Sequence, residues 1–231
     1  MESGYLYHYT SLEALALILE NKTIRFNRLD KVDDKKEAHS DVLNNLCRKV
    51  FVSCWTKENE ENPALWHMYT PDSRGIRIKV DENLFSIESY KETGLFKETK
   101  NGYRVIGTGI KTHISDIELV AIEYGETRIV KPKRVIEQDM DWLQYSEKLL
   151  GRIKSKHWEF QKEYRFIINH LFKEEVEEIY IGLNTDVLDG VEIVCGPKMS
   201  DGEKIILESL LQKYCNQYSI KESCLNIRDR N

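Results

Sequence analysis

Three groups of side chains in this sequence could do chemistry: an imidazole near the N-terminus, two aromatic rings, and a late carboxylate. The imidazole is that of His8, which lies at the end of the β-prone run from Tyr5 to Tyr9. Strand alternation places His8 on the same face as Leu6. A histidine beside apolar neighbours either binds a ligand or is a hydrogen-bonded core residue, and the pattern alone leaves both interpretations open.

The aromatic pair is Trp66 and Tyr69, which follow Pro63 at helical spacing. Residues three apart project from the same side of a helix, so the two rings could form a wall for a flat ligand. The same spacing is equally typical of core packing.

The carboxylate is that of Glu163, at the start of a predicted strand that runs to Ile168. Alternation places Glu163 and Arg165 on one face. Such a pair could stabilise a developing positive charge or could be a plain ion pair.

Familiar cofactor and metal motifs are absent. There is no P-loop, no G-x-G-x-x-G, no G-x-S-x-G and no H-E-x-x-H. The acidic residues between Asp30 and Glu37 lack the glycine of an EF-hand loop, and acidic helix entry explains them better. The five cysteines form no C-x-x-C pair, which favours reduced thiols. We therefore expect no metal site.

The charge distribution predicts no general attraction to nucleic acid or to a membrane. The net charge is −5, and the two signs are interspersed. Only residues 128–134 are locally basic, and a solvated loop between strands explains them well. The longest apolar stretch, Leu12 to Leu19, is too short to span a bilayer, and residues 1–4 do not resemble a signal peptide. We expect a cytoplasmic protein.

The elements that must position these residues are mainly strands. We predict strands at 5–9, 23–27, 51–55, 75–80, 103–106, 118–124, 164–168, 179–181 and 191–195. We predict helices at 12–21, from about 35 to 47, at 63–69, at about 139–156, and after Pro197 and Ser200. The order is irregular, so the fold class expected is α+β, in one domain over residues 1–231. In the strand at 75–80, the apolar residues are expected to face inward and the basic ones outward.

Six blocks of the sequence together resemble the bacterial domain-of-unknown-function family 2971. They are Leu6 to Ser11, Val52 to Trp55, Leu65 to Tyr69, Arg74 to Ile76, Trp158 to Arg165 and Tyr180 to Gly182. The resemblance covers about residues 5–200 and leaves 201–231 as a C-terminal helix and tail.

A more distant resemblance, to the ADP-ribosyltransferase superfamily, bears on function. The succession of His8 and Thr10, a strand with Ser53, an aromatic residue, and Gln161-x-Glu163 is similar to that layout. The resemblance implies a split, mostly antiparallel sheet flanked by helices, around a cleft that binds NAD as a substrate. It also implies that nicotinamide is released and that ADP-ribose passes to a protein or nucleic-acid acceptor.

The same resemblance assigns roles to particular residues. Glu163 would steady the cationic sugar of the transition state, His8 would hold a ribose, and Gln161 would help to select the acceptor. The remaining NAD-binding residues would be Tyr9, Thr10, Ser53, Trp66, Tyr69 and Arg165.

Two other functions compatible with the sequence belong to different classes. One is a non-catalytic domain that binds a nucleotide and reports it to a partner. The other is a nucleic-acid-processing enzyme of a phage-defence or toxin system, acting through the basic residues at 128–134 and 152–156.

Overall fold

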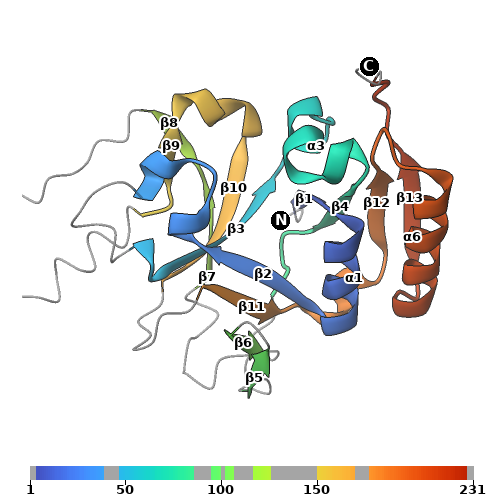
Figure 1. Ribbon diagram of the computed structural model, residues 1–231, viewed down its shortest axis with the longest axis horizontal. Helices are drawn as coiled ribbons and strands as arrows, with labels where there is room; N and C mark the ends of the chain where they lie inside the picture. Colours follow the sequence, from blue (N-terminus) through green and yellow to red (C-terminus); the bar gives the residue numbers. More distant parts are fainter. Residues whose placement is uncertain are drawn as a thin grey trace, which may run out of the picture. The chain divides into compact units, whose positions relative to one another are not determined.

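The computed structural model describes residues 4–38, 47–85, 95–99, 102–106, 117–125, 150–169 and 177–227 (Figure 1). The fold is mixed α+β with an open, mostly antiparallel sheet, which confirms the predicted class. The ADP-ribosyltransferase-like arrangement within that class stays a prediction.

The chain divides into two compact units. The first comprises Met1–Ile24, Trp55–Thr93 and Gly182–Asn231, and the second comprises Arg25–Cys54 and Gly94–Ile181. The strands β2 (Thr23–Arg28), β3 (Val50–Thr56) and β11 (Glu178–Gly182) each contain a point where the chain passes from one unit to the other. The expectation of a single domain over 1–231 stays a prediction.

The first unit is built on four strands in the order β13-β12-β4-β1. These are β1 (Tyr5–Thr10), β4 (Ile76–Asp81), β12 (Val191–Cys195) and β13 (Tyr218–Glu222). β4 pairs antiparallel with both β1 and β12, whereas β13 pairs parallel with β12. The C-terminal end of β3 also joins this unit, where Thr56 lies opposite Tyr7.

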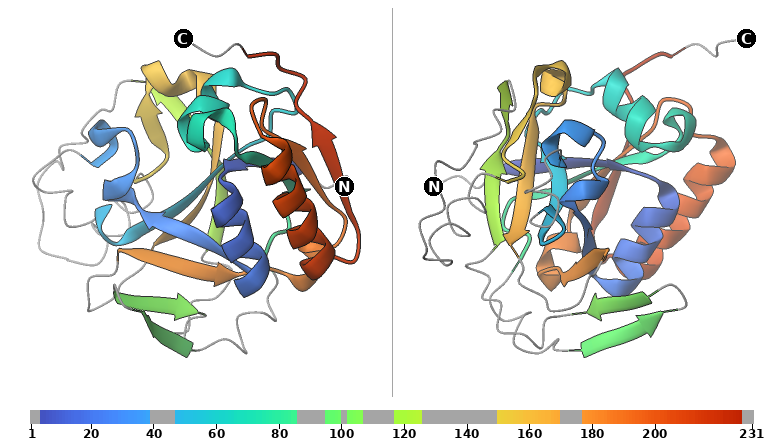
Figure 2. Two further views of the ribbon diagram at one scale, coloured as in Figure 1. Left: turned by 45° about the vertical axis from the view of Figure 1, so that its right-hand side comes forward. Right: turned by 60° about the vertical axis from the view of Figure 1, so that its left-hand side comes forward.

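Helices cover both faces of this part of the sheet. α1 (Leu12–Asn21) and α6 (Asp201–Tyr214) pack side by side (Figure 2). Ser11 caps α1, and Ser200 caps α6 in a capping box with Glu203. α3 (Pro63–Tyr69) begins with the proline that a first helical turn tolerates.

Two clusters of apolar side chains hold these layers together. On the α1 side, Leu15 and Leu19 meet Ile78 and Val80 of β4 around a small apolar hollow with room for about one water molecule. On the other face, Leu65 and Trp66 of α3 pack against Tyr9 and Val194.

The second unit carries the remaining strands. β10 (Glu163–Asn169) pairs with β3 and, antiparallel, with β7 (Ile117–Ala121), and β2 pairs antiparallel with β3. β5 (Leu95–Thr99) and β6 (Gly102–Ile106) form an antiparallel pair, β11 pairs parallel with β6, and β8 (Glu123–Gly125) pairs parallel with β9 (Ile153–Ser155). Short 3-10 helices lie at η1 (Leu29–Lys31), η2 (Lys35–Ala38) and η5 (Lys156–Gln161), while η3 (Pro71–Ser73) and η6 (Thr185–Leu188) belong to the first unit.

Two expectations about elements are wrong, and a third lies mostly outside the described residues. The helix predicted over about 139–156 is wrong at its C-terminal end, where Ile153–Ser155 is strand β9; residues 139–149 lie outside the described residues. Most of the helix expected to end near Cys47 also lies outside them. In β4, Arg77 is buried although it was expected to face outward, because the segment before α3 and two tyrosines of β1 cover that face.

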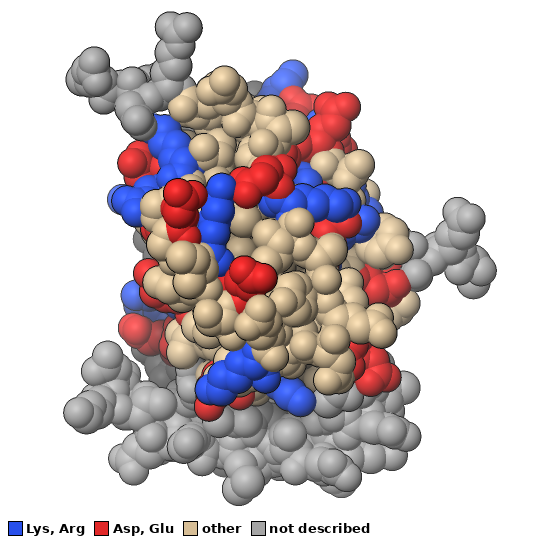
Figure 3. Space-filling model, turned by 90° about the vertical axis from the view of Figure 1, so that its right-hand side faces the viewer, with Lys and Arg blue, Asp and Glu red and all other residues tan. Residues whose placement is uncertain are grey.

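No helix among the described residues is long and apolar enough to cross a membrane. On the face shown in Figure 3, lysine and arginine side chains are interspersed with aspartate and glutamate, and no broad area carries a single charge. This agrees with the interspersed charges of the sequence.

Candidate functional site

The residues that the sequence predicted for one site belong to both units. His8, Tyr9, Thr10, Trp66 and Tyr69 lie in the first unit, and Ser53, Gln161, Glu163 and Arg165 lie in the second. Their convergence on one nucleotide therefore stays a prediction, and each set is described within its own unit.

His8 lies on the α1-covered face of the first unit. It is opposite Ile78 in the β1–β4 ladder, and its ring centroid is 4.8 Å from that of Trp55. The imidazole is partly exposed and stands beside apolar neighbours, as the alternation predicted. Thr10, two residues further, is buried.

The two aromatic candidates differ in exposure. Trp66 is fully buried, packs edge-on against Tyr9 at 4.9 Å, and donates its indole N–H to Glu61 at 2.9 Å. Its role in this structure is therefore core packing. Tyr69 is only partly buried, so it is the better placed of the two rings to stack on a ligand.

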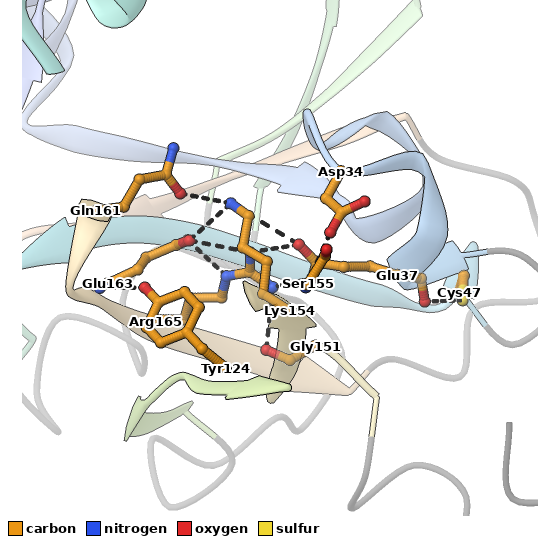
Figure 4. Close-up of polar contacts among 10 residues, drawn as sticks. All are labelled: Asp34, Glu37, Cys47, Tyr124, Gly151, Lys154, Ser155, Gln161, Glu163 and Arg165. Carbon is orange, nitrogen blue, oxygen red and sulfur yellow. Dashed lines mark hydrogen bonds and ion pairs between the residues drawn. The ribbon is translucent and has the colours of Figure 1, made fainter. Parts of the chain in front are cut away.

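The second unit contains a buried group of charged and polar side chains, which we call the ionic cluster. It consists of Glu37, Lys154, Gln161, Glu163 and Arg165 (Figure 4), and none of them is more than 7% exposed. The three sequence-predicted residues Gln161, Glu163 and Arg165 are thus brought together.

Local backbone structure explains the placement of Gln161, Glu163 and Arg165. η5 ends at Gln161, and Lys162 adopts the left-handed conformation with φ 44° that turns the chain into β10. Alternation along β10 then puts Glu163 and Arg165 on one face, as predicted.

Arg165 uses all three guanidinium nitrogens in the cluster. Its Nε donates to Glu163 Oε1 at 2.6 Å and its Nη2 donates to Glu163 Oε2 at 3.2 Å. Nη2 also donates to Glu37 Oε1 at 2.9 Å, Nη1 binds Glu37 Oε2, and Nη1 donates to the Gly151 carbonyl at 3.1 Å. Two carboxylates and a carbonyl therefore satisfy a guanidinium that is 0% exposed.

Lys154 links the rest of the cluster. Its Nζ donates to Gln161 Oε1 at 2.7 Å and to Glu163 Oε2 at 2.9 Å, and it lies 3.8 Å from Glu37 Oε1. The ammonium also lies 4.9 Å from the centroid of the Trp158 ring. One ammonium group thus fixes the Gln161 and Glu163 side chains relative to each other.

The cluster contains two cations and two carboxylates, but the two carboxylates differ. Burial alone raises the pKa of Glu163, yet the charge and hydrogen bonds of Arg165, with the charge of Lys154, bring it down to about 2. For Glu37, burial raises the pKa, and the hydrogen bond and charge of Arg165 only partly offset the increase. Glu163 is therefore ionised throughout the neutral and mildly acidic range.

Neighbouring side chains complete the surroundings of Glu163. Its backbone N–H donates to the Tyr124 hydroxyl at 2.7 Å, and burial raises the pKa of Tyr124 to about 12. Burial also raises the pKa of the Cys54 thiol, which is hydrogen-bonded to Glu163. Ser53 precedes Cys54 on β3, the strand next to β10, and is buried.

The acidic residues considered for a metal have other partners. Arg28 donates to both oxygens of Asp30, Asp34 accepts the backbone N–H of Ser155 at 3.0 Å, and Glu37 belongs to the ionic cluster. Within the described part of the chain, no group of three or more His, Cys, Asp or Glu side chains is arranged to hold a metal ion.

Two of the basic residues considered for nucleic-acid binding make ion pairs with carboxylates of the second unit. Arg152 makes a two-nitrogen ion pair with Glu118, and Lys154 is 2% exposed within the cluster. Residues 128–134 lie outside the described residues.

Sequence reasoning did not assign Glu37 and Lys154 to this site. Glu37 lies 128 positions from Arg165, and no local pattern links residues so far apart. Lys154 fell within a predicted polar helix, where a lysine is expected to be solvated. The strand that contains it, Ile153–Ser155, is only three residues long, so no period in the sequence indicated its burial.

Chemically, the ionic cluster holds an ionised carboxylate and an amide in a fixed relation inside a low-dielectric environment. No protein-family model matches the chain, and comparisons with curated proteins and with solved structures find no match.

Proposed function

We propose that the chain is an NAD-dependent ADP-ribosyltransferase in which Glu163 stabilises the cationic sugar formed as nicotinamide leaves. The observation that carries the proposal is that Gln161 and Glu163 lie close together at the start of β10, where both accept from the Lys154 ammonium in the free protein. Cleavage of a glycosidic bond to nicotinamide mainly requires negative charge placed against a developing oxocarbenium ion.

The ionisation of Glu163 supports this role. With a pKa of about 2, the carboxylate carries its full charge at neutral pH. Gln161, two residues earlier, would orient the acceptor, which is a protein or a nucleic acid. Ser53 on β3 would contribute to NAD binding from the strand beside β10.

The proposal requires the substrate to reach a carboxylate that is 5% exposed. Arg165 donates two hydrogen bonds to Glu163 from a planar guanidinium, whereas Lys154 donates one from the end of a flexible side chain. Lys154 is therefore the partner that must yield when the sugar approaches, and its departure would leave the carboxylate less neutralised.

The decisive experiment follows nicotinamide release from NAD, with and without cell lysate as a source of acceptors. Wild type is compared with Glu163→Gln and with the matched control Glu178→Gln, which changes a glutamate of the same unit that is 41% exposed at its side chain. We expect Glu163→Gln to lower the rate by roughly 10²–10³-fold, as when one stabilising group is removed from a transition state. Glu178→Gln should leave it unchanged.

Circular dichroism and the thermal midpoint of each variant show whether it is folded. If Glu163→Gln does not fold, Gln161→Ala tests the pair, with a loss of transfer to the acceptor as the expected result. Equal release by wild type and a folded Glu163→Gln, or no release by wild type with any acceptor, contradicts the proposal.

A second candidate function is favoured by the charge balance of the cluster. Two cations neutralise two carboxylates, which leaves little net charge with which to stabilise a cation. The chain would then bind a nucleotide without turnover. Equilibrium dialysis with NAD distinguishes the two functions, because only the non-catalytic one predicts binding without turnover that Glu163→Gln does not change.

A further inference from the structure

Arg77 of β4 is a buried cation in the first unit that lacks an anionic partner. It is 5% exposed and forms no ion pair with any carboxylate in the described part of the chain. Its Nη1 donates to the Asn59 carbonyl at 2.8 Å, and its buried Nε has no hydrogen-bond partner. This is an unusual state, because buried charges are normally paired.

The neighbours of Arg77 only partly compensate its charge. The guanidinium carbon lies 4.8 Å from the centroid of the Tyr7 ring and 5.9 Å from that of Tyr9, so both rings attract the cation. Glu61 is a carboxylate of the same unit, but its oxygens accept hydrogen bonds from Trp66, Ser223 and Cys224 instead.

Asn59 presents two oxygen atoms to this site. Its backbone oxygen accepts from Arg77, and its side-chain Oδ1 accepts from the Tyr7 hydroxyl at 2.7 Å. Asn59 itself is exposed, in the segment between β3 and α3. Two neutral oxygens of one exposed residue thus occupy donors that two oxygens of an anion would satisfy better, because hydrogen bonds between charged groups are stronger.

Both donors are suited to an anion at neutral pH. Arginine side chains stay charged in proteins. Burial raises the pKa of Tyr7, so its hydroxyl keeps its proton. The register places Tyr9 opposite Arg77 and Tyr7 opposite Lys79, so the Arg77 side chain lies between the two tyrosines on one face of the sheet.

We propose that Arg77 and Tyr7 form a binding site for a small oxyanion, a phosphate or carboxylate group, which Asn59 occupies in the free protein. Binding would displace the Asn59 oxygens into solvent, where water can satisfy them, and would give Arg77 the charge partner that it lacks. The site lies wholly within the first unit and does not depend on the proposed function.

The test is calorimetric titration of the full chain with inorganic phosphate and, separately, with acetate. Asn59→Gly, which removes the Oδ1 acceptor and loosens the segment, should strengthen binding several-fold. Arg77→Lys keeps the charge but loses the planar fork, and we expect binding to weaken by about tenfold or more. Tyr7→Phe should weaken it by roughly five- to tenfold, the equivalent of one lost hydrogen bond.

The matched control is Arg74→Lys, because Arg74 is an exposed arginine of the same unit that pairs with Glu203. It should bind like wild type. Preference for phosphate identifies a phosphorylated ligand, and preference for acetate identifies a carboxylate ligand.

Two results would overturn the site. One is the absence of binding to both probes at millimolar concentration by wild type and by Asn59→Gly. The other is binding that neither Arg77→Lys nor Tyr7→Phe weakens. Asn59→Gly leaves the buried side chains intact, so the test holds even if a core variant fails to fold.

Discussion

Arg165 and Arg77 are two buried arginines, one in each unit, and their surroundings differ. Arg165 has five hydrogen bonds or ion pairs to two carboxylates and a carbonyl. Arg77 has a hydrogen bond to a carbonyl, a side-chain hydrogen bond with Tyr9 and two aromatic faces, but no carboxylate among the described residues. A buried guanidinium can thus be held either by full ionic compensation or by polar and π contacts alone. The first arrangement is closed to a new anion, whereas the second can accept one.

Replacing each arginine by methionine tests this comparison, and the larger loss in the free energy of unfolding should come from Arg165→Met. Arg165→Met leaves Glu37 and Glu163 buried with only Lys154 as a cation, so we expect a loss of about 3–5 kcal/mol in the free energy of unfolding. Urea denaturation measures it, with Arg25→Met as a control because Arg25 and its partner Glu178 are exposed. A loss no larger than that of the control would show that the cluster does not hold its charges as described.

A smaller effect is expected from acid. The pKa of Glu163 is lowered from 4.5 to about 2. Its stabilising contribution is therefore complete above pH 4.5 and is lost as the pH falls toward 2. Comparing wild type with Glu163→Gln by urea denaturation across this range, we expect their difference to shrink by roughly 2–3 kcal/mol. The raised pKa of Glu37 affects the pH dependence of stability in the opposite sense to the lowered pKa of Glu163. Stability curves of the two proteins that stay parallel across this pH range would contradict the assignment to Glu163.

The smallest effect should come from Arg77→Met. No carboxylate is orphaned by this change, and the Asn59 carbonyl can turn to water, so the expected loss is about 1 kcal/mol. Lys221→Met serves as the control, since Lys221 makes an exposed ion pair with Glu192 from the same face of the first unit. A loss as large as that of Arg165→Met would mean that Arg77 has an ionic partner and is not an open site.

Much of the fold could be predicted from local patterns. A clear period and a clear start signal mark three elements: the strand at Val191–Cys195, the helix that begins at Pro63 and the strand that begins near Glu163. β13 was not predicted, because Tyr218–Glu222 is largely exposed and its apolar alternation is limited to Tyr218 and Ile220. β9 was missed because three residues are too few to show a period.

The candidate site was only partly predictable. Strand alternation placed Glu163 and Arg165 on one face. That inference is local, because the two residues are only two positions apart in the sequence. The burial of Arg77 could not be predicted, because it depends on Asn59 and on the tyrosines of β1, which are distant in the sequence. Basic residues that alternate with apolar ones are normally solvated, and only the tertiary structure reverses that expectation here.

The order of the two units along the chain bears on how the protein is made. The last residue of the second unit is Ile181, whereas β12, α6 and β13 of the first unit all follow Gly182. During synthesis from the N-terminus, the second unit can therefore be complete while the first still lacks its last segment, Gly182–Asn231. A nascent chain that has emerged from the ribosome only as far as Ile181 lacks Leu183, Leu188 and Val191, which close the apolar hollow beside α1. Chaperone binding should be greatest at that length.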